Sequence, residues 1–370
     1  MDFELSEMQQ MVVDSAERLV TAETGLDQWH ARRKLTDGVD PKLWVKMAEL
    51  GWMALVIPED AGGLGCPMED LALLMIELGR GLVTEPLIST SVLAAHVLDR
   101  ALVSERRAHW LGRIATGEVR IALAHEEPHT NGTIGVSARR IEDGYMLDGQ
   151  KAVAFDAPSA GYLLVTSELE GTSALFLVAR ESTGIATNSY ALIDGSRAAD
   201  LTFASAHVPS DGLIASGAAA DRILNEALDR ARVALIAQAV GAMEVALRIT
   251  AGYAKERQQF GQPIGKFQAV QHMAADMFVA AYQARSALYA ALRDIDGDAS
   301  KRARSVAMAK VVAGMAGQTV SRNGVQIHGG YGVTDEYVIS HYYRRLLVLE
   351  KQYGGIDLNA AKLALCEAEA

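Results

Sequence analysis

The spacing of the apolar residues changes twice along this chain of 370 residues. It is three or four in the first third, as in LALLMIEL at 71–78, which is typical of helices that bury one face. It becomes two in the middle, where Tyr145 and Leu147 alternate with polar neighbours, and the helical spacing returns from Asp221 onward. A doubly wound nucleotide-binding sheet needs strands and helices that alternate, so this order argues against that fold.

The same pattern predicts an α+β fold in three domains. We expect an N-terminal α-helical domain at 1–118, a middle β-barrel or sheet domain at 119–218, and a C-terminal helical bundle at 219–370. Two segments of the last domain, 233–243 and 311–321, contain no charged residue. Helices that are apolar on every side are buried inside bundles, so both segments should lie in the core.

Composition and charge disfavour several classes of partner. The formal net charge is -11, with 35 Lys and Arg against 46 Asp and Glu, whereas nucleic-acid binding depends on clustered cations. The two cysteines, Cys66 and Cys366, are too few and too far apart for a disulfide framework or a zinc site. The N-terminal residues include acids where a signal peptide has cations, and no uncharged run approaches the roughly 20 residues of a membrane span. We therefore expect a cytoplasmic protein that binds neither nucleic acid nor a membrane.

Three stretches of the chain contain distinctive motifs. They read ELGWMALVIPEDAGGLG at 49–65, AKERQQFGQPIGKFQAVQHMAADM at 254–277, and QIHGGYGVTDEYVISHYYRR at 326–345. Together with the helix, sheet, helix order, they resemble the acyl-CoA dehydrogenase family of flavoproteins, and the resemblance runs almost from end to end. It implies an N-terminal helical domain, a middle β domain and a C-terminal four-helix bundle.

The resemblance also implies a reaction and its participants. Members of the family oxidise the Cα and Cβ atoms of an acyl-CoA thioester: a glutamate takes the α proton, and N5 of FAD takes a hydride from Cβ. The FAD of these proteins lies between the sheet domain and the bundle of one subunit, with its ADP half on a neighbouring subunit. Their usual electron acceptor is an electron-transfer flavoprotein.

Five residues of this chain match the positions with which the family holds the ADP half of FAD. The resemblance places a pyrophosphate-binding cation at Arg257 and an adenosine-side aromatic at Phe260. It places further contacts at Gln268, which follows Phe267 in the motif, and at Gln326 and Gly330. A planar guanidinium suits pyrophosphate oxygens, and glycines let backbone N–H groups approach a phosphate.

One of these assignments, and a histidine next to the glycine turn, have simpler alternatives. An arbitrary arginine at a helix end is more often a member of a surface ion pair, which is the alternative for Arg257. His328, which precedes Gly329 and Gly330, is more simply a spacer than an acid or base. The combination of motifs favours the cofactor interpretation for Arg257.

The segments that surround the flavin ring in the family are altered here. In AHEEPHTNG, Glu126 replaces a threonine and residues 129–131 replace a turn of small residues. In KAVAFDAP, Val153 stands for a tryptophan and Phe155 for a hydrogen-bonding threonine. A carboxylate opposes the charge of a reduced flavin and is costly when buried without a partner, and a phenylalanine adds bulk. Both changes disfavour a flavin ring, unless loop lengths shift this alignment.

Both positions at which the family has its catalytic glutamate lack a carboxylate. Counted without a gap, the first is Tyr353, whose ordinary pKa near 10 leaves it protonated at neutral pH. The second, just before Arg232, is Ala231. Glu350 and Glu226 are weak candidates for a relocated base, and each is more simply a helix-surface acid.

The altered and the retained positions favour one interpretation over two others. The leading hypothesis is a non-catalytic subunit of a heterotetrameric acyl-CoA dehydrogenase, similar to those that act on steroid or other bulky or dicarboxylic acyl-CoAs. A catalytic partner would supply the glutamate and the ring site, and the bundle, with Met308 and Met315, would form the contact between chains. One alternative is an autonomous homotetrameric enzyme with a relocated base. The other is an acyl-CoA-binding protein without redox chemistry.

Overall fold

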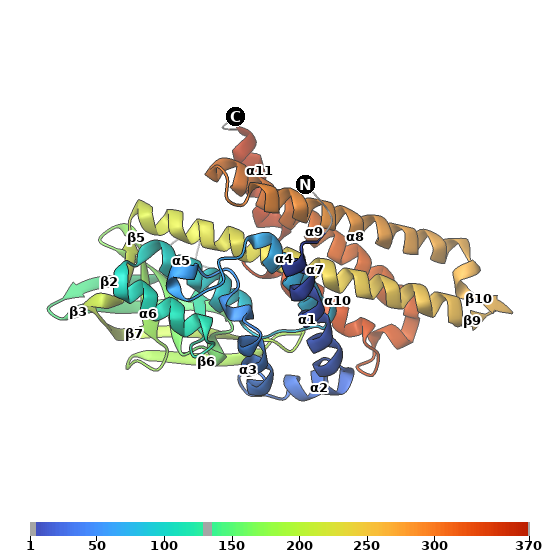
Figure 1. Cartoon of the computed structure of the whole chain (residues 1–370), viewed down its shortest axis with the longest axis horizontal. Helices are drawn as coiled ribbons and strands as arrows, with labels where there is room; N and C mark the ends of the chain where they lie inside the picture. Colours follow the sequence, from blue (N-terminus) through green and yellow to red (C-terminus); the bar gives the residue numbers. More distant parts are fainter. Residues whose placement is uncertain (1–4, 129–134, 369–370) are drawn as a thin grey trace. The chain divides into compact units, whose positions relative to one another are not determined.

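The computed structural model describes residues 5–128 and 135–368 and confirms the order of helices, strands and helices (Figure 1). The fold class is α+β, as predicted, while the domain boundaries at 118 and 218 stay predictions. The N-terminal segment forms α1 (Glu7–Glu23), α2 (Leu26–Arg33), α3 (Pro41–Glu49), α4 (Met68–Arg80), the π-helix η3 (Ile88–Ala94), α5 (Ala95–Ala101) and α6 (Ser104–Ala115).

The middle segment forms one eight-stranded sheet in the order β6-β7-β3-β2-β4-β5-β8, with β1 beside β4. The pairs β1–β4 and β2–β4 are parallel, and the other neighbours are antiparallel. The strands are β1 (Ile121–Ala124), β2 (Val136–Ile141), β3 (Gly144–Phe155), β4 (Tyr162–Leu169), β5 (Thr172–Ala179), β6 (Ile185–Ala191), β7 (Arg197–Pro209) and β8 (Leu213–Ser216).

The C-terminal segment is helical apart from one short hairpin. Its two segments without charge are largely buried, as the sequence predicts. The elements are α7 (Ala218–Glu256), β9 (Gln258–Gln259), β10 (Gln262–Pro263), α8 (Gln268–Asp294), α9 (Ala299–His328), the 3-10 turn η7 (Gly329–Val333), α10 (Ile339–Lys351) and α11 (Ile356–Ala368).

Contacts divide the chain into two compact units. The helical unit contains Met1–His30, Met68–Val83 and Arg232–Ala370, and the sheet unit contains Ala31–Pro67 and Thr84–Ala231. The N-terminal helices are therefore shared: α1 and α4 belong to the helical unit, whereas α3, α5 and α6 pack with the strands.

Local sequence explains where several helices begin. The Ser6 hydroxyl accepts a hydrogen bond from the Gln9 N–H, and the Gln9 side chain accepts one from the Ser6 N–H, which is a capping box for α1. The carboxylates of Asp40 and Asp298 cap α3 and α9 in the same way, each accepting from two backbone N–H groups. These caps satisfy donors that have no partner inside the helix.

Two glycines allow α4 and α7 to cross closely within the helical unit. A Cβ atom on Gly79 would lie 2.0 Å from the carbonyl oxygen of Gln238, and one on Gly241 would lie 1.9 Å from that of Ile76. The helix α7 is long and apolar enough to cross a membrane, but 78% of its most apolar 18-residue window is buried within the protein. Internal packing of this kind accounts for its apolar surface.

The sheet unit has a core drawn from most of its strands, and a distortion in β3. Between Lys151 and Ala154 the pairing of β3 with β7 shifts register, and Val153 has φ of 47°. A β-branched residue rarely adopts this left-handed backbone, so the bulge is strained. The core residues on these strands include Leu163, Val165, Phe176, Leu201, Phe203 and Val208.

Candidate functional site

The five residues assigned to the ADP half of FAD lie at one end of the helical unit. There the Tyr253 ring of α7 stacks on His328 of α9 with centroids 4.3 Å apart, and Asn323 of α9 donates to the Met273 carbonyl of α8 over 3.4 Å. The end of α7, the start of α8 and the end of α9 therefore meet. This end includes Arg257 after α7, Phe260 in the hairpin, Gln268 at the start of α8, Gln326 in the last turn of α9, and Gly330 in η7.

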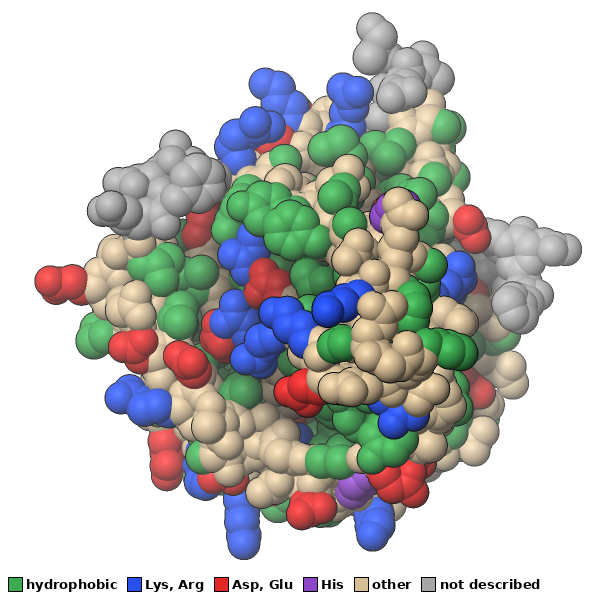
Figure 2. Space-filling model, turned by 90° about the vertical axis from the view of Figure 1, so that its right-hand side faces the viewer, with side chains coloured by type: hydrophobic (Ala, Val, Ile, Leu, Met, Phe, Trp, Pro, Cys, Tyr) green, Lys and Arg blue, Asp and Glu red, His purple; other side chains and the backbone are tan. Residues whose placement is uncertain are grey.

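Several side chains at this end of the helical unit are exposed to solvent and make few contacts within the chain. Phe260 is 92% exposed, between β9 and β10, and its ring meets that of Phe267 edge to face. Within the described ranges, the Arg257 side chain forms no ion pair or hydrogen bond, so the surface-pair alternative has no support. Figure 2 shows the face at the β9–β10 end, where cationic and apolar side chains are exposed together.

The glycine turn η7 presents its backbone to solvent. A Cβ atom on Gly329 or Gly330 would meet no atom within 4 Å, so an anion can approach both. Gly332 instead faces α9, where a Cβ would lie 2.7 Å from the Val325 carbonyl oxygen. The turn is thus fixed on its inner side and open on its outer side, and with Arg257 it fits a pyrophosphate.

A buried ion pair supports the strands near the predicted ring-side positions. The Lys151 side chain is 0% exposed; its Nζ contacts the Glu127 carboxylate and donates to Thr166 Oγ1 at 2.8 Å. Burial lowers the pKa of Lys151, and the bond to Glu127 opposes that effect. Glu126, by contrast, is exposed, so the expected cost of burying its carboxylate does not arise. Residues 129–131 lie outside the described residues.

The other ring-side positions do not fit an isoalloxazine. The Val153 N–H already donates to Asp200 Oδ1 at 3.0 Å, and the Tyr190 hydroxyl donates to the same oxygen at 2.9 Å. Burial and then this bond raise the pKa of Tyr190 to about 12. Phe155 is 8% exposed and has no polar group to offer. The sheet unit therefore lacks the donors that a flavin ring needs at these two positions.

Arg197 fastens the segment between α2 and α3 to the sheet. Its guanidinium donates to the carbonyl oxygens of Arg33 and Leu35 at 2.7 Å, of Gly195 at 2.8 Å and of Thr36 at 3.3 Å. Four neutral acceptors surround one cation, an arrangement that suits the fixed fork of an arginine. No sequence motif pointed to this residue.

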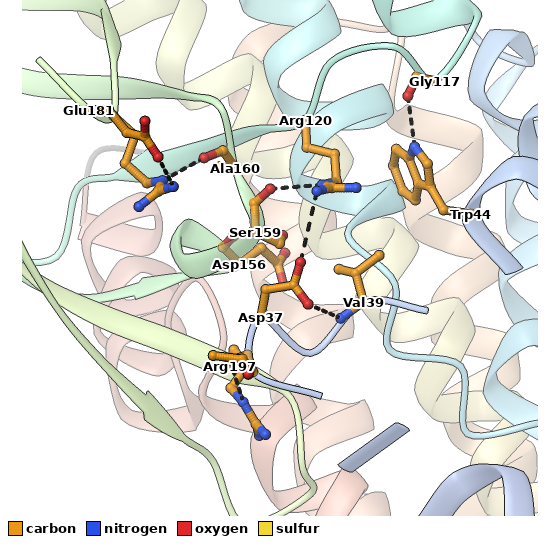
Figure 3. Close-up of polar contacts among 12 residues, drawn as sticks. Asp37, Val39, Trp44, Gly117, Arg120, Asp156, Ser159, Ala160, Glu181 and Arg197 are labelled. Carbon is orange, nitrogen blue, oxygen red and sulfur yellow. Dashed lines mark hydrogen bonds and ion pairs between the residues drawn. The ribbon is translucent and has the colours of Figure 1, made fainter. Parts of the chain in front are cut away.

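A second arginine lies in the same unit, and Figure 3 shows both. Arg120 donates to the Ser159 carbonyl at 2.7 Å and lies 3.9 Å from the Asp37 carboxylate. The indole of Trp44 donates to the Gly117 carbonyl at 2.8 Å. These contacts join α3 and the α2–α3 segment to the chain before and after β1.

The two positions that the resemblance assigns to the family's glutamate are buried and contain no acid. Tyr353 is 3% exposed with φ of 55°, and its carbonyl oxygen accepts a hydrogen bond from Arg232 Nε at 2.9 Å. Ala231 is 0% exposed on α7. A methyl group cannot take an α proton, and a phenol is protonated at neutral pH and has no site ready to accept one.

Glu350 has a structural partner at the start of the next helix. Its Oε1 accepts from the Ile356 N–H, the first of α11, at 2.8 Å, and its Oε2 lies 3.1 Å from Lys351 Nζ. Nearby, the buried Lys310 donates to the Leu349 carbonyl oxygen, and burial lowers the pKa of this lysine to about 7. The carboxylate of Glu350 therefore joins α10 to α11 as a helix cap.

Glu226 is similarly engaged, in the sheet unit. Its carboxylate lies 3.4 Å from His96 and from Arg222 and 3.7 Å from Arg100. Burial and then Arg230 lower the pKa of His96 to about 4, so this histidine is neutral at pH 7. Glu350 and Glu226, the two weak candidates for a relocated base, thus both have structural roles.

Comparisons with known proteins agree with this arrangement. The chain matches the model of the acyl-CoA dehydrogenase N-terminal domain over residues 6–118 and that of the C-terminal domain over 222–359. A chain from the structure of a variant of the Tcur3481-Tcur3483 steroid ACAD is 31% identical, with 98% of each chain covered and a TM-score of 0.89.

Two further proteins are similar over nearly the whole chain. A chain of the ChsE4-ChsE5 complex from Mycobacterium tuberculosis is 27% identical, with 100% of each chain covered and a TM-score of 0.92. The acryloyl-CoA reductase (NADH) of Anaerotignum propionicum is 29% identical over 98% of this chain and 95% of its own. The fold, the matched domains and the retained motifs together show that this chain belongs to the acyl-CoA dehydrogenase family of flavoproteins.

Proposed function

We propose that this chain is the non-catalytic subunit of a heterotetrameric, FAD-dependent acyl-CoA dehydrogenase. The observation that carries the proposal is the absence of an acid at Tyr353 and Ala231, in a chain whose ADP-side residues are exposed and available. A catalytic partner chain supplies the glutamate and the ring site. This chain supplies the groups that hold the ADP half of the partner's FAD.

The roles of the ADP-side residues follow from their chemistry. The guanidinium of Arg257 would pair with the pyrophosphate, and the open backbone of Gly330 would lie against the same anion. Phe260 would cover the adenosine, with Gln268 and Gln326 as amide contacts. FAD, when bound, supplies the hydride acceptor.

An exposed apolar face on α8 and α9 is where the partner would pack. Phe278, Val279 and Tyr282 are 55%, 52% and 63% exposed, and they line a groove of about 580 Å³. Met308 and Met315 are 42% and 58% exposed, so they are surface residues and not core. Exposed apolar side chains on two neighbouring helices favour a protein contact.

The similar structures support a heteromeric assembly and a bulky substrate. One is a complex of ChsE4 with ChsE5, and another is described as a steroid ACAD formed by Tcur3481 and Tcur3483. By analogy, we place a steroid-like or similarly bulky acyl-CoA in the assembled enzyme, with an electron-transfer flavoprotein as acceptor and the cytoplasm as location.

Purification with and without a partner tests the proposal. The chain expressed alone should be nearly colourless, whereas co-expression with a dehydrogenase-like chain that retains the glutamate should give a yellow complex with one FAD for each pair of chains. Arg257→Ala in this chain should lower the flavin content of the complex. Arg293→Ala, at the other end of α8, is the matched control.

Two other results would each support a different function. A yellow, active protein from this chain alone, inactivated by Glu350→Gln, would show an autonomous enzyme with a relocated base. A colourless protein that binds an acyl-CoA in every combination would show a binding protein without redox chemistry. Either result overturns the subunit proposal.

A further inference from the structure

Two buried histidines lie on either side of the glycine turn η7 in the helical unit. His328 is the last residue of α9 and directly precedes the turn, and His341 lies in the first turn of α10, after it. They are 3% and 1% exposed, respectively. Neither residue has a part in the proposed cofactor contacts.

His328 holds the end of α9 with one ring nitrogen. Its Nδ1 lies 2.7 Å from the Gly324 carbonyl oxygen, and since a carbonyl only accepts, Nδ1 has the proton. The ring stacks on Tyr253 and lies 5.0 Å from Tyr337, centroid to centroid. Its Nε2 is buried and accepts no hydrogen bond from the residues that the structure describes.

His341 holds the segment after the turn in the same manner. Its Nε2 donates to the Asp335 carbonyl oxygen at 3.0 Å, and its ring stacks on Trp29 with centroids 3.7 Å apart. Its Nδ1 is buried, again with no donor among residues 5–128 and 135–368. The Asp335 side chain pairs with Arg344 at 2.6 Å, which fixes the same segment from outside.

The turn itself rests on these two anchors. A Cβ on Gly332 would lie 3.0 Å from the Cβ of His328, so the turn packs directly on this histidine. The Tyr331 ring lies 4.9 Å from Tyr337 at a tilt of 51°, which extends the ring cluster around His328 into the turn. Movement of either histidine would therefore displace the glycines that face outward.

We propose that His328 and His341 are positioning residues that hold the two ends of the nucleotide-facing turn, and that they do so only as neutral imidazoles. This inference rests on the proposed function, which makes η7 a pyrophosphate contact. A second proton would give each ring a buried N–H group without an acceptor and would place a positive charge in a buried site. The turn should then open so that water can reach the ring.

The surroundings of both rings oppose protonation. Burial lowers the pKa of His328, and the groups around its ring are the uncharged Tyr253 and Tyr337. Burial lowers the pKa of His341 to about 4; Arg344 and His30 act in the same direction, and Asp335 opposes them. At neutral pH both anchors are therefore intact.

Two conservative variants keep the hydrogen bond of each histidine but remove its ability to take up a second proton. His328→Asn keeps an N–H near the position of Nδ1, and His341→Gln keeps one near Nε2, while neither side chain titrates. The full-length chain is studied at pH 7.5 and 6.0, above its isoelectric point near 5.4. His109→Asn, at an exposed site on α6, is the control.

Hydrogen exchange of residues 325–337, corrected for intrinsic rates, is the first readout. Opening should increase about fourfold from pH 7.5 to 6.0 through His341 alone, since the open form takes up the proton first. The increase should disappear in the doubly substituted His328→Asn, His341→Gln chain and persist in His109→Asn. Exchange that does not depend on pH, or an equal increase in the double variant, overturns the inference.

Binding of ADP-ribose to the flavin-free complex of this chain with its catalytic partner, measured by calorimetry, is the second readout, because the chain alone is expected to hold little cofactor. This probe contains the ADP half of FAD, and its pyrophosphate diester keeps its charge over this pH range. Wild-type affinity should fall at pH 6.0 and that of the double variant should not. If exchange depends on pH as expected but ADP-ribose does not bind at pH 7.5, the proposed function fails. The nucleotide-positioning role of the two histidines then fails with it. Their pH-dependent hold on the turn would still be shown by the exchange data.

Discussion

Arg232 donates a hydrogen bond from Nε to the carbonyl oxygen of Tyr353 over 2.9 Å, in the interior of the helical unit. Arg232 follows Ala231 in the chain, and the resemblance assigns the family's base to the positions of Ala231 and Tyr353. The arginine therefore stabilises the backbone at a position that has no acid. It thus has a structural role that does not depend on catalysis.

Restoring the glutamate alone should not produce an enzyme. In Tyr353→Glu the new carboxylate is available, but Val153 and Phe155 still lack the polar groups that a flavin ring needs. We expect the isolated variant to reduce an electron-acceptor dye with steroid-type acyl-CoAs no faster than the wild-type chain. Acyl-CoA-dependent turnover by this single variant would contradict our account of the sheet unit.

Removal of the ADP-side cation should weaken FAD binding in the assembled complex. A hydrogen bond to a charged group contributes about 1.5–3 kcal/mol, so Arg257→Ala should raise the Kd for FAD by roughly 10- to 100-fold. The Kd of Arg257→Lys should lie between those of the wild type and Arg257→Ala, because a lysine is a single point charge. Flavin fluorescence during dilution measures this, and an unchanged Kd in Arg257→Ala would exclude the assignment.

Relief of the backbone strain in β3 should stabilise the protein. Val153 has φ of 47°, a conformation that costs roughly 1–2 kcal/mol for an L-residue with a β-branched side chain and little for glycine. We expect Val153→Gly to raise the free energy of unfolding by about 1 kcal/mol in urea titrations. Val153→Ala keeps a Cβ in the strained conformation and should change the free energy of unfolding by less. A lower free energy of unfolding in Val153→Gly would show that the packing of the valine side chain outweighs the backbone strain.

Loss of Arg197 should free the segment between α2 and α3. Four carbonyl oxygens would lose their donor in Arg197→Met, which keeps the length of the aliphatic stem. The expected loss of stability is about 2–3 kcal/mol, with faster hydrogen exchange at 33–37. Arg140→Met, which breaks an exposed pair with Glu170, should cost less than about 1 kcal/mol. Equal effects of the two substitutions would refute a special role for Arg197.

The buried Lys310 should make the free energy of unfolding depend on pH between about 7 and 10. Burial lowers the pKa of this lysine to about 7 in the folded chain, below its value of 10.5 when exposed. Between these values the unfolded chain binds the extra proton, so stability should rise with pH from about 7 toward 10, by at most about 1.4 kcal/mol per unit. Comparison with Lys310→Met at each pH isolates this slope, and parallel curves would contradict the assignment.

Sequence was most informative where a pattern repeats or a motif is contiguous. The change of hydrophobic period predicted the order of helices and strands, because burial of one face requires that spacing. The residues that the motifs assign to the ADP half lie together at one end of the helical unit, since they belong to helix ends that meet, and their role stays a prediction.

Other features depend on contacts that no local pattern encodes. The membership of α3, α5 and α6 in the sheet unit could not be predicted, because the bonds from Arg197 to the α2–α3 segment join residues about 160 positions apart. Likewise, the expectation that Glu350 is a helix-surface acid is wrong, because this residue is 5% exposed. Its role as a cap for α11 depends on the direction of the chain after Tyr353, which no local pattern encodes.

The crossing of Gly79 and Gly241 sets a limit on how the helical unit can vary. A single methyl group on either helix would overlap a main-chain oxygen of the other, and the collision involves backbone, which cannot rotate away as a side chain can. Related chains that differ elsewhere in this unit must therefore keep glycine at both positions or shift an entire helix.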